Sequence, residues 1–344
     1  MSRPLVTIVM CVYNAGEYLE ASVASALGQT HREIELLLVD DGSTDGAVDA
    51  LLSKVSDARM RVIRQENQGK PAALNRAIAE LKGEYYAVQD ADDLSFAQRI
   101  ERQLAEFEAD PELAAVFCGH ELILDDKRVA PRFRHKNRAD CVEEIAAFRM
   151  PAHDPTGMYR MSKVRDILYG ADFPICQGHD YILRVGEAHP IEVLGECLYT
   201  YRVHRTSITK RTPQRREKLK RLVLQKACDR RGADFDTEFP HLRDRGDGEM
   251  DRPEILDNNL PAHFIESVLD HRRAGRWPGA MLVGWQCAKL QPLSGPYYKP
   301  LIYATAPRSM VNKVRRSHGL VGLDTHASNG SNGHVRAAEG GAAG

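Results

Sequence analysis

LVTIVMCVYN, residues 5–14, opens a pattern that repeats along the first 93 residues of the chain. Its continuous apolar, β-branched run is typical of a strand that is buried on both faces of a sheet. Apolar residues at helical spacing follow it, and further strands are predicted at 34–39, 60–64 and 84–89, with helices between them. This alternation predicts βαβ units, and therefore an α/β fold with a mostly parallel, twisted sheet flanked by helices.

Polar side chains follow each of the four predicted strands. They are Asn14 after the first strand, Asp40-Asp41 after the second, residues 67–70 after the third and residues 90–93 after the fourth. In an open α/β sheet, ligands bind at the edge formed by the carboxyl ends of the strands. We therefore expect these four clusters to meet at one crevice.

The strongest candidate for chemistry is the quartet Asp90-Ala91-Asp92-Asp93. Three carboxylates so close together repel one another unless a cation or another positive group offsets their charge. Mg²⁺ or Mn²⁺ can do this, held by one or two carboxylates while phosphate oxygens complete the coordination shell. Such a metal would also neutralise a departing diphosphate. The alternative is an acidic turn in which Asp93 caps the next helix, and at the end of a buried strand we favour the metal.

Asp41 and Lys70 are candidates for contact with a nucleotide. The Asp41 carboxylate can accept hydrogen bonds from a base NH or a ribose hydroxyl. Lys70 stands beside a predicted helix N-terminus, where a cation and backbone NH groups together suit an anion; a solvated surface lysine is the alternative. Turn chemistry accounts for the neighbours: Ser43 or Thr44 is predicted to cap the second helix, and Pro71 to be the first residue of the third.

Four motifs follow one another along the chain: VMCVYN at 9–14, VDDGSTD at 39–45, NQGKPAALN at 67–75 and DADD at 90–93. In this order and at these spacings they resemble the motifs of family 2 glycosyltransferases. The resemblance covers about residues 4–208 and implies the GT-A type of Rossmann-like fold and inversion of the anomeric centre. It implies these site residues: Tyr13 and Asp41 at the nucleoside, Lys70 near the base or diphosphate, and Asp90 and Asp92 at the ribose and the metal. YRVHRTSI, at 201–208, resembles the segment that closes the donor site, where His204 would touch the diphosphate or the metal.

The catalytic base is expected in the segment CQGHDYILR, which ends at Arg184. Inversion needs a carboxylate, opposite the leaving group, that takes the proton of the acceptor hydroxyl. The resemblance implies an acidic pair that opens a helix, a second acid two residues later and an Arg beyond. If Arg184 is the anchor, Gly178 falls where the base should be and Asp180 matches the second, structural acid; if Asp180 is the anchor, the helix is two residues shorter. We predict Asp180 as the base, with an N-cap as its alternative role and His179 and Asp154 as reserves.

The chain divides into three predicted parts: a nucleotide-sugar-binding catalytic domain over residues 1–210, a mainly helical C-terminal extension over 211–316 and a disordered tail over 317–344. Later elements of the first part are less regular. They comprise strands at 114–118 and 122–124 around a hairpin near Asp125-Asp126, a helix around 180–187 and a strand near 198–203.

The composition is that of an ordinary globular protein. The 344 residues carry a formal net charge of −1, so no overall field favours nucleic acid as a partner. Seven cysteines, an odd number without a CxxC pair, predict reduced thiols rather than a disulfide framework. Neither a signal peptide nor a run of about 18 apolar residues is present. We therefore expect a cytoplasmic protein.

The expected partners are a nucleoside diphosphate sugar, with UDP favoured over GDP, and a saccharide or lipid-linked acceptor in glycan or glycolipid biosynthesis. The basic stretch 205–231 and the aromatic residues within 277–303 could hold the extension on the inner face of an anionic membrane. A helical cap on the catalytic domain or a homodimer surface is the alternative.

Three other functions compete with sugar transfer. A nucleotidyltransferase would carry a basic, Gly-rich loop after the first strand, but residues 12–17 contain no Lys or Arg. A processive polysaccharide synthase would carry Gln-x-x-Arg-Trp, whereas residues 273–277 read RAGRW and lack the Gln. A non-catalytic nucleotide-sugar-binding or scaffold protein stays open because of Gly178.

Overall fold

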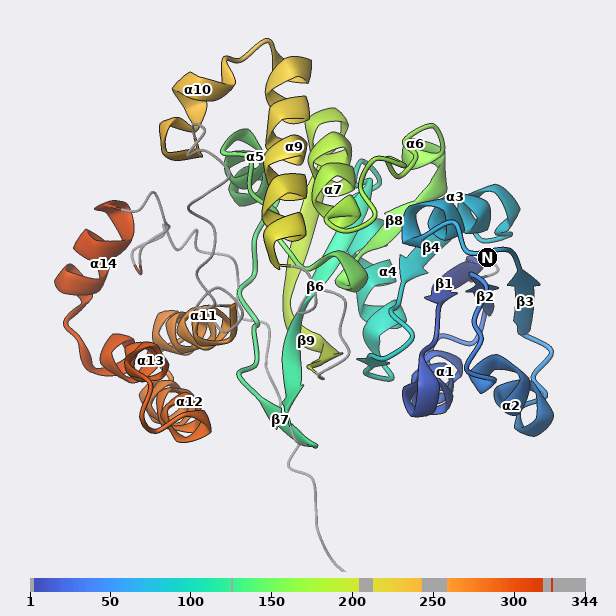
Figure 1. Cartoon of the computed structure of the whole chain (residues 1–344), viewed down its shortest axis with the longest axis horizontal. Helices are drawn as coiled ribbons and strands as arrows, with labels where there is room; N and C mark the ends of the chain where they lie inside the picture. Colours follow the sequence, from blue (N-terminus) through green and yellow to red (C-terminus); the bar gives the residue numbers. More distant parts are fainter. Residues whose placement is uncertain (1–2, 125, 204–212, 243–258, 318–322, 324–344) are drawn as a thin grey trace, which may run out of the picture.

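The computed structural model describes residues 3–124, 126–203, 213–242, 259–317 and 323. Within this part of the chain, one nine-stranded sheet runs in the order β3-β2-β1-β4-β8-β6-β9-β5, with β7 paired to β6 (Figure 1). The strands are β1 (Val6–Val12), β2 (Ile34–Asp40), β3 (Met60–Arg64), β4 (Tyr85–Val88), β5 (Leu94–Ser95), β6 (Ala115–Leu124), β7 (Lys127–Val129), β8 (Met158–Arg160) and β9 (Ile191–Arg202).

The first half of the sheet is parallel, as the alternating pattern predicts. β1 pairs in parallel with β2 and β4, and β2 pairs in parallel with β3. The register aligns Val12 with Asp40 and Asp40 with Arg64, so the carboxyl ends of neighbouring strands lie level. The connections are α1 (Leu19–Leu27), α2 (Ala47–Lys54) and α3 (Lys70–Glu80). This half of the sheet therefore presents its loops on one edge.

The second half of the sheet is mixed. β8 is antiparallel to β4 and β6, β9 is parallel to β6, and β5 is antiparallel to β9. The two strands expected at 114–118 and 122–124 are one strand, β6, and its pairing with β9 shifts register around Gly119. A Cβ on Gly119 would lie 2.0 Å from the carbonyl oxygen of Arg132, so the chain passes too close for any larger residue. β7 completes the hairpin that was expected at this place.

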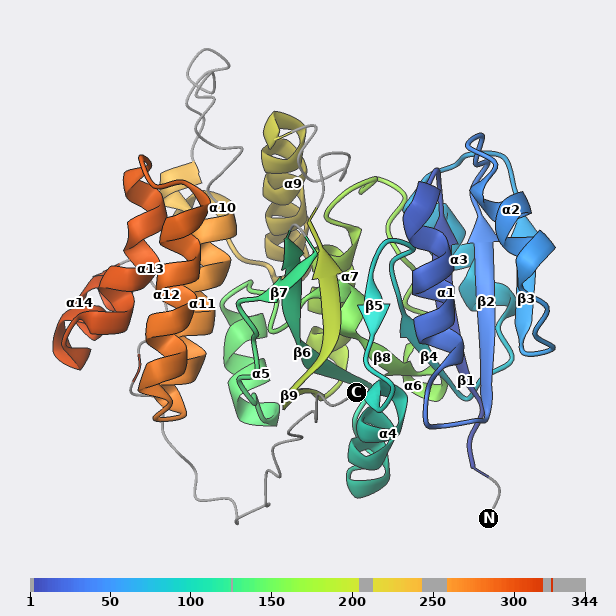
Figure 2. The ribbon, with the colours of Figure 1, turned by 90° about the horizontal axis from the view of Figure 1, so that it is seen from below.

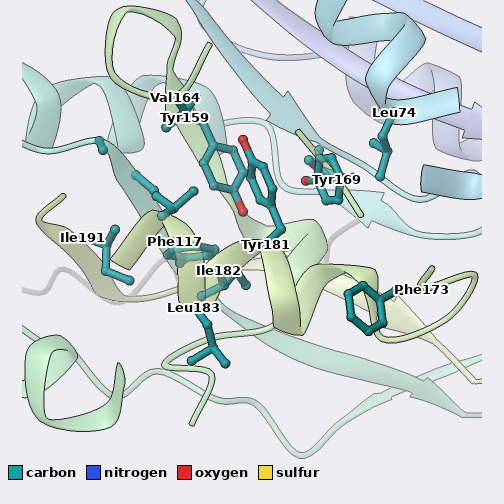
Figure 3. Packing of buried hydrophobic residues seen from close by; sticks show 14 of the residues in the cluster. Leu74, Phe117, Tyr159, Val164, Tyr169, Phe173, Tyr181, Ile182, Leu183 and Ile191 are labelled. Carbon is teal, nitrogen blue, oxygen red and sulfur yellow. The ribbon is translucent and has the colours of Figure 1, made fainter. Parts of the chain in front are cut away.

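Helices cover both faces of the sheet (Figures 1 and 2). Ile8 of β1 faces α1, α2 and α4 (Arg99–Ala109), while the next residue, Val9, faces the opposite layer. That layer contains α3, α5 (Arg138–Ala146), α7 (Gln177–Ala188) and α9 (Pro213–Arg231). Its centre is aromatic: the rings of Tyr169 and Tyr181 stack 3.9 Å apart, and the Tyr159 ring meets Tyr181 edge-on at 5.4 Å (Figure 3). Strands buried on both faces explain why β1 and β2 are apolar almost throughout.

The segment after residue 210 is helical, but its helices join two different layers. α9 and α10 (Phe235–Glu238) belong to the core that contains α7. α11 (Asn259–Arg273), α12 (Trp277–Leu290) and α13 (Gly295–Thr305) pack against one another and, through Phe264, against Leu122 of β6; α14 (Arg308–Ser317) follows α13 (Figure 2). The described part of the chain contains no helix long and apolar enough to span a membrane. All seven cysteines are unpaired.

Two predicted helix starts differ in detail. Neither Ser43 nor Thr44 caps α2; this helix begins after Gly46, which has a φ of 73°, and Asp45 Oδ1 accepts a hydrogen bond from the amide of Ala47. The reason is that the Ser43 and Thr44 groups are used across the strand ends, as described below. Pro71 is the second residue of α3 rather than the first.

Candidate functional site

The loops after β1 and β2 are tied together by short hydrogen bonds. The Asn14 amide N–H donates to Ser43 Oγ at 3.1 Å, and Asn14 Oδ1 accepts from the backbone N–H of Thr44 at 2.8 Å. Asn14 adopts a left-handed φ of 54°, which its short polar side chain tolerates. Beside it, the Tyr13 side chain is half exposed at the sheet edge. An exposed aromatic ring in this place offers a face for a planar base.

Asp41 is buried and holds the loop that leads from β3 to α3. Its Oδ1 accepts hydrogen bonds from Gln65 Nε2 at 2.8 Å and from the Gln68 amide at 2.9 Å. Its Oδ2 accepts from the Gly69 amide at 2.8 Å. Gly69 has a φ of 87°, and Lys70 follows it directly. The carboxylate therefore fixes the position of Lys70 and of the α3 N-terminus.

Lys70 and Asp90 join the third and fourth strand ends. Lys70 Nζ lies 2.6 Å from Asp90 Oδ1, and both side chains are partly buried. Burial alone would lower the pKa of Lys70, but the negative charges of Asp90 and Asp154 raise it above its ordinary value. Lys70 is therefore a fixed positive charge at a helix N-terminus, a combination that suits a phosphate.

The three carboxylates of Asp90, Asp92 and Asp93 offer oxygen atoms within 4.8 Å of one another. Asp93 does not cap a helix: its Oδ2 accepts from the Tyr199 hydroxyl at 2.9 Å, and its Oδ1 from the Arg202 amide at 2.8 Å. Burial, and after it the charges of Asp92 and Asp90, raise the pKa of Asp93 well above its ordinary value. Asp93 thus anchors the cluster to β9.

An all-oxygen set of carboxylates is the kind of donor set that Mg²⁺ and Mn²⁺ prefer. Because both oxygens of Asp93 are hydrogen-bonded to β9, the partly exposed Asp90 and Asp92 are the residues suited to hold such an ion. The residues present therefore fit a divalent cation.

Asp180 and His179, two residues considered for the catalytic base, are both bound to other residues of the protein. Asp180 is buried in α7, and its Oδ2 accepts from Arg184 Nε at 2.9 Å and Nη2 at 2.7 Å; Arg230 Nη1 lies 3.4 Å from its Oδ1. His179 Nε2 lies 3.1 Å from the Phe148 carbonyl oxygen, and burial lowers its pKa. Both side chains are thus engaged with other parts of the protein. This argues against the prediction of Asp180 as the base, because the guanidinium groups of Arg184 and Arg230 bind its carboxylate.

Asp154, by contrast, belongs to the site. It begins the short 3-10 helix Asp154–Thr156, is only 7% exposed, and lies close enough to Lys70 and Asp90 for their charges to act on it. His204 lies outside the described residues.

Arg99 is a site residue that the sequence did not suggest. It is fully buried at the start of α4, and its Nη2 donates to the carbonyl oxygens of Val88 and Pro155, both at 2.9 Å, and of Gly157 at 3.3 Å. It therefore ties the end of β4, just before Asp90, to the segment that carries Asp154. An Arg in an amphipathic helix ordinarily indicates a solvated face, so no local signal could have revealed this.

Comparisons with known proteins identify a matching family model and similar sequences. Residues 7–167 match the family model described as Glycosyl transferase family 2. A putative teichuronic acid biosynthesis glycosyltransferase of Bacillus subtilis, TuaG, is 36% identical over 135 residues, which cover 39% of this chain and 53% of TuaG. The matches to the first curated relatives span between 47% and 66% of those proteins' lengths.

Two solved structures show the same fold at low identity. S. aureus TarS 1–349 in complex with UDP-GlcNAc has a TM-score of 0.57 and 17% identity, and the match covers 92% of each chain. The mannosyltransferase PcManGT from Pyrobaculum calidifontis, in complex with GDP-Man and Mn²⁺, has a TM-score of 0.55 and 20% identity, and the match covers 91% of this chain and 88% of that one.

Proposed function

We propose that the chain is a member of glycosyltransferase family 2, whose model matches residues 7–167, and that it transfers a sugar from a nucleoside diphosphate, with UDP favoured, to a hydroxyl group of a saccharide or lipid-linked acceptor. One observation carries the proposal. Four strand-end loops converge on a cluster in which Lys70 Nζ contacts Asp90 and three carboxylates approach within 4.8 Å. TarS and PcManGT, which share the fold, have been solved with UDP-GlcNAc and with GDP-Man and Mn²⁺.

Each of the strand-end residues would contact a different part of the nucleotide-sugar donor. Tyr13 would face the base, and Asp41 would keep the 65–69 loop beside the nucleoside and accept a hydrogen bond from it. Asp90 would contact the ribose, and Lys70 with the α3 N-terminus would hold the diphosphate. Asp90 and Asp92 would hold Mn²⁺ or Mg²⁺, which when bound would offset the charge of the departing diphosphate.

The transfer would invert the anomeric centre in a single displacement. The acceptor oxygen bonds to the anomeric carbon while the bond from that carbon to the diphosphate oxygen breaks, and the electron pair leaves with the diphosphate. The acceptor proton needs a base on the opposite face, whereas the leaving group needs no acid because it departs as an anion.

A second candidate function is binding without turnover. Gly178 and the guanidinium-bound Asp180 leave α7 without a free carboxylate in its first turn, which favours a nucleotide-sugar-binding or scaffold protein. A panel of UDP- and GDP-sugars incubated with the protein and Mn²⁺ separates the two. Release of nucleoside diphosphate that EDTA abolishes supports transfer, whereas calorimetric binding without release supports the scaffold.

The outer face of α12 supports a further part of the proposal, a peripheral contact with an anionic membrane. Large apolar side chains are exposed along this helix at Trp277, Met281, Leu282 and Trp285. Aromatic and aliphatic groups on one helix face can settle into a lipid headgroup region. Co-sedimentation with phosphatidylglycerol vesicles, lost in Trp285→Asp, would support it. Failure to bind vesicles together with a dimer in sedimentation velocity would assign the face to a second copy instead.

A further inference from the structure

Gly178, in the first turn of α7, has no room for a side chain. A Cβ built on it would lie 2.2 Å from Cγ and 2.4 Å from Oδ2 of Asp154. Those distances are far inside van der Waals contact, so even alanine would displace the carboxylate. The backbone of Gly178 is helical and does not itself require glycine. The glycine is explained by the Asp154 carboxylate, which fills the volume where a side chain at 178 would begin.

The position of the Asp154 carboxylate is fixed, but one of its two oxygens lacks a hydrogen-bond partner. It is buried, and Oδ1 has no hydrogen-bond partner among the described residues, an arrangement that normally costs free energy. The backbone around it is held firmly: the Gly157 amide donates to the Asp154 carbonyl oxygen at 3.0 Å, and Arg99 binds the next carbonyl, that of Pro155, at 2.9 Å. Costly buried groups that are held in place cluster at functional sites.

The electrostatic surroundings connect Asp154 with the donor cluster. Burial raises the pKa of Asp154 to about 6, the positive charge of Lys70 lowers it, and the negative charge of Asp90 raises it further. At neutral pH the carboxylate is ionised, and it is a stronger base than an ordinary aspartate. Asp180, whose two oxygens are bound by Arg184 and Arg230, offers no such free oxygen.

We propose that Asp154 is the general base of the transfer, and that it supplies from the 3-10 helix Asp154–Thr156 the carboxylate that α7 lacks at Gly178. The inference rests on the proposed function. Oδ1 takes the proton of the acceptor hydroxyl as the acceptor oxygen bonds to the anomeric carbon and the diphosphate leaves with its electron pair.

Four variants test this role of Asp154 on a nucleotide sugar that the wild type turns over with Mn²⁺. Asp154→Asn should lower kcat by about 10²–10⁴-fold, while calorimetric binding of UDP changes by less than about threefold. Asp180→Asn is the matched control, and turnover should stay within about threefold of the wild type. The pair Asp154→Gly with Gly178→Asp should recover at least about tenfold over Asp154→Gly alone, because the carboxylate returns to the same volume from α7.

The outcomes separate the base from the function. A wild type that binds the nucleotide sugar but releases no diphosphate would overturn the proposed function. A wild type that turns over, with Asp154→Asn equally active, would overturn only the base. Thermal unfolding of every variant shows whether it is folded. If the double variant Asp154→Gly with Gly178→Asp is folded but no more active than Asp154→Gly, the result would also count against Asp154 as the base.

Discussion

Replacing Asp154 by asparagine should stabilise the folded protein. The folded-state pKa is about 6, against an ordinary value of 3.8, because burial penalises the charged form. Each pH unit between the two pKa values is worth about 1.4 kcal/mol, so at about pH 8 the ionised carboxylate lowers the free energy of unfolding by about 3 kcal/mol. The amide of asparagine stands in for the neutral acid, and Asp154→Asn should recover most of that difference.

The raised pKa of Asp154 determines both the sign of the stability change in Asp154→Asn and its dependence on pH. Asp154 ionises at a lower pH in the unfolded chain than in the folded protein, so the wild type loses stability as the pH rises from about 3.8 to about 6. The stability gained by Asp154→Asn should therefore be roughly half as large near pH 5 as at about pH 8. Urea unfolding of wild type and Asp154→Asn with EDTA present measures it. Exposed Asp166→Asn, which also removes one negative charge, serves as the control. A variant less stable than the wild type at about pH 8, or a gain that does not change with pH, would refute the reasoning.

Three further changes have distinct expected results. Asp180→Ala should destabilise the fold by about 3 kcal/mol in urea unfolding because it leaves Arg184 without its buried partner; an unchanged midpoint would be inconsistent with a structural ion pair. Asp41→Ala removes three hydrogen bonds to the 65–69 loop, so UDP binding measured by calorimetry should weaken about tenfold or more; equal affinity would argue against it. Asp92→Asn should abolish metal-dependent turnover with the melting temperature kept, and full activity would exclude Asp92 as a ligand.

The sequence predicted well that the polar clusters at the strand ends meet, because the signals for this are local. A strand buried on both faces is apolar throughout, and the rule that ligands bind at carboxyl ends then places Asn14, Asp41, Lys70 and Asp90 together. The structure brings these loops together through Asn14 with Thr44, Asp41 with Gly69, and Lys70 with Asp90.

The surroundings of Asp154 and Gly178 were harder to predict because they depend on contacts between distant segments. Residues 154 and 178 meet only through the packing of α7 on the sheet, and no spacing rule connects them. The expectation for Asp180 followed the order of acidic residues along one helix, whereas its environment, with Arg184 four residues on and Arg230 from α9, depends on tertiary structure. The bonds of Asp93 to Tyr199 and Arg202 are long-range in the same sense.

The C-terminal helical extension likewise shows that contacts between distant segments could not be predicted from the sequence. Helical periodicity after residue 210 was correctly recognised, but α9 packs on α7 while α11–α13 pack on one another. Which layer an amphipathic helix joins depends on the surface that meets its apolar face, and a single sequence does not contain that information.

The most direct test of the account is the position of the metal and the nucleotide. A crystal of the protein grown with UDP and Mn²⁺, with data collected at the manganese absorption edge, would locate the ion from its anomalous signal. We expect one peak beside the Asp90 and Asp92 carboxylates, with the diphosphate next to Lys70 and the uracil next to Tyr13. A nucleotide bound elsewhere, or a manganese peak away from Asp90 and Asp92, would contradict the central claim that the strand-end cluster is the donor site.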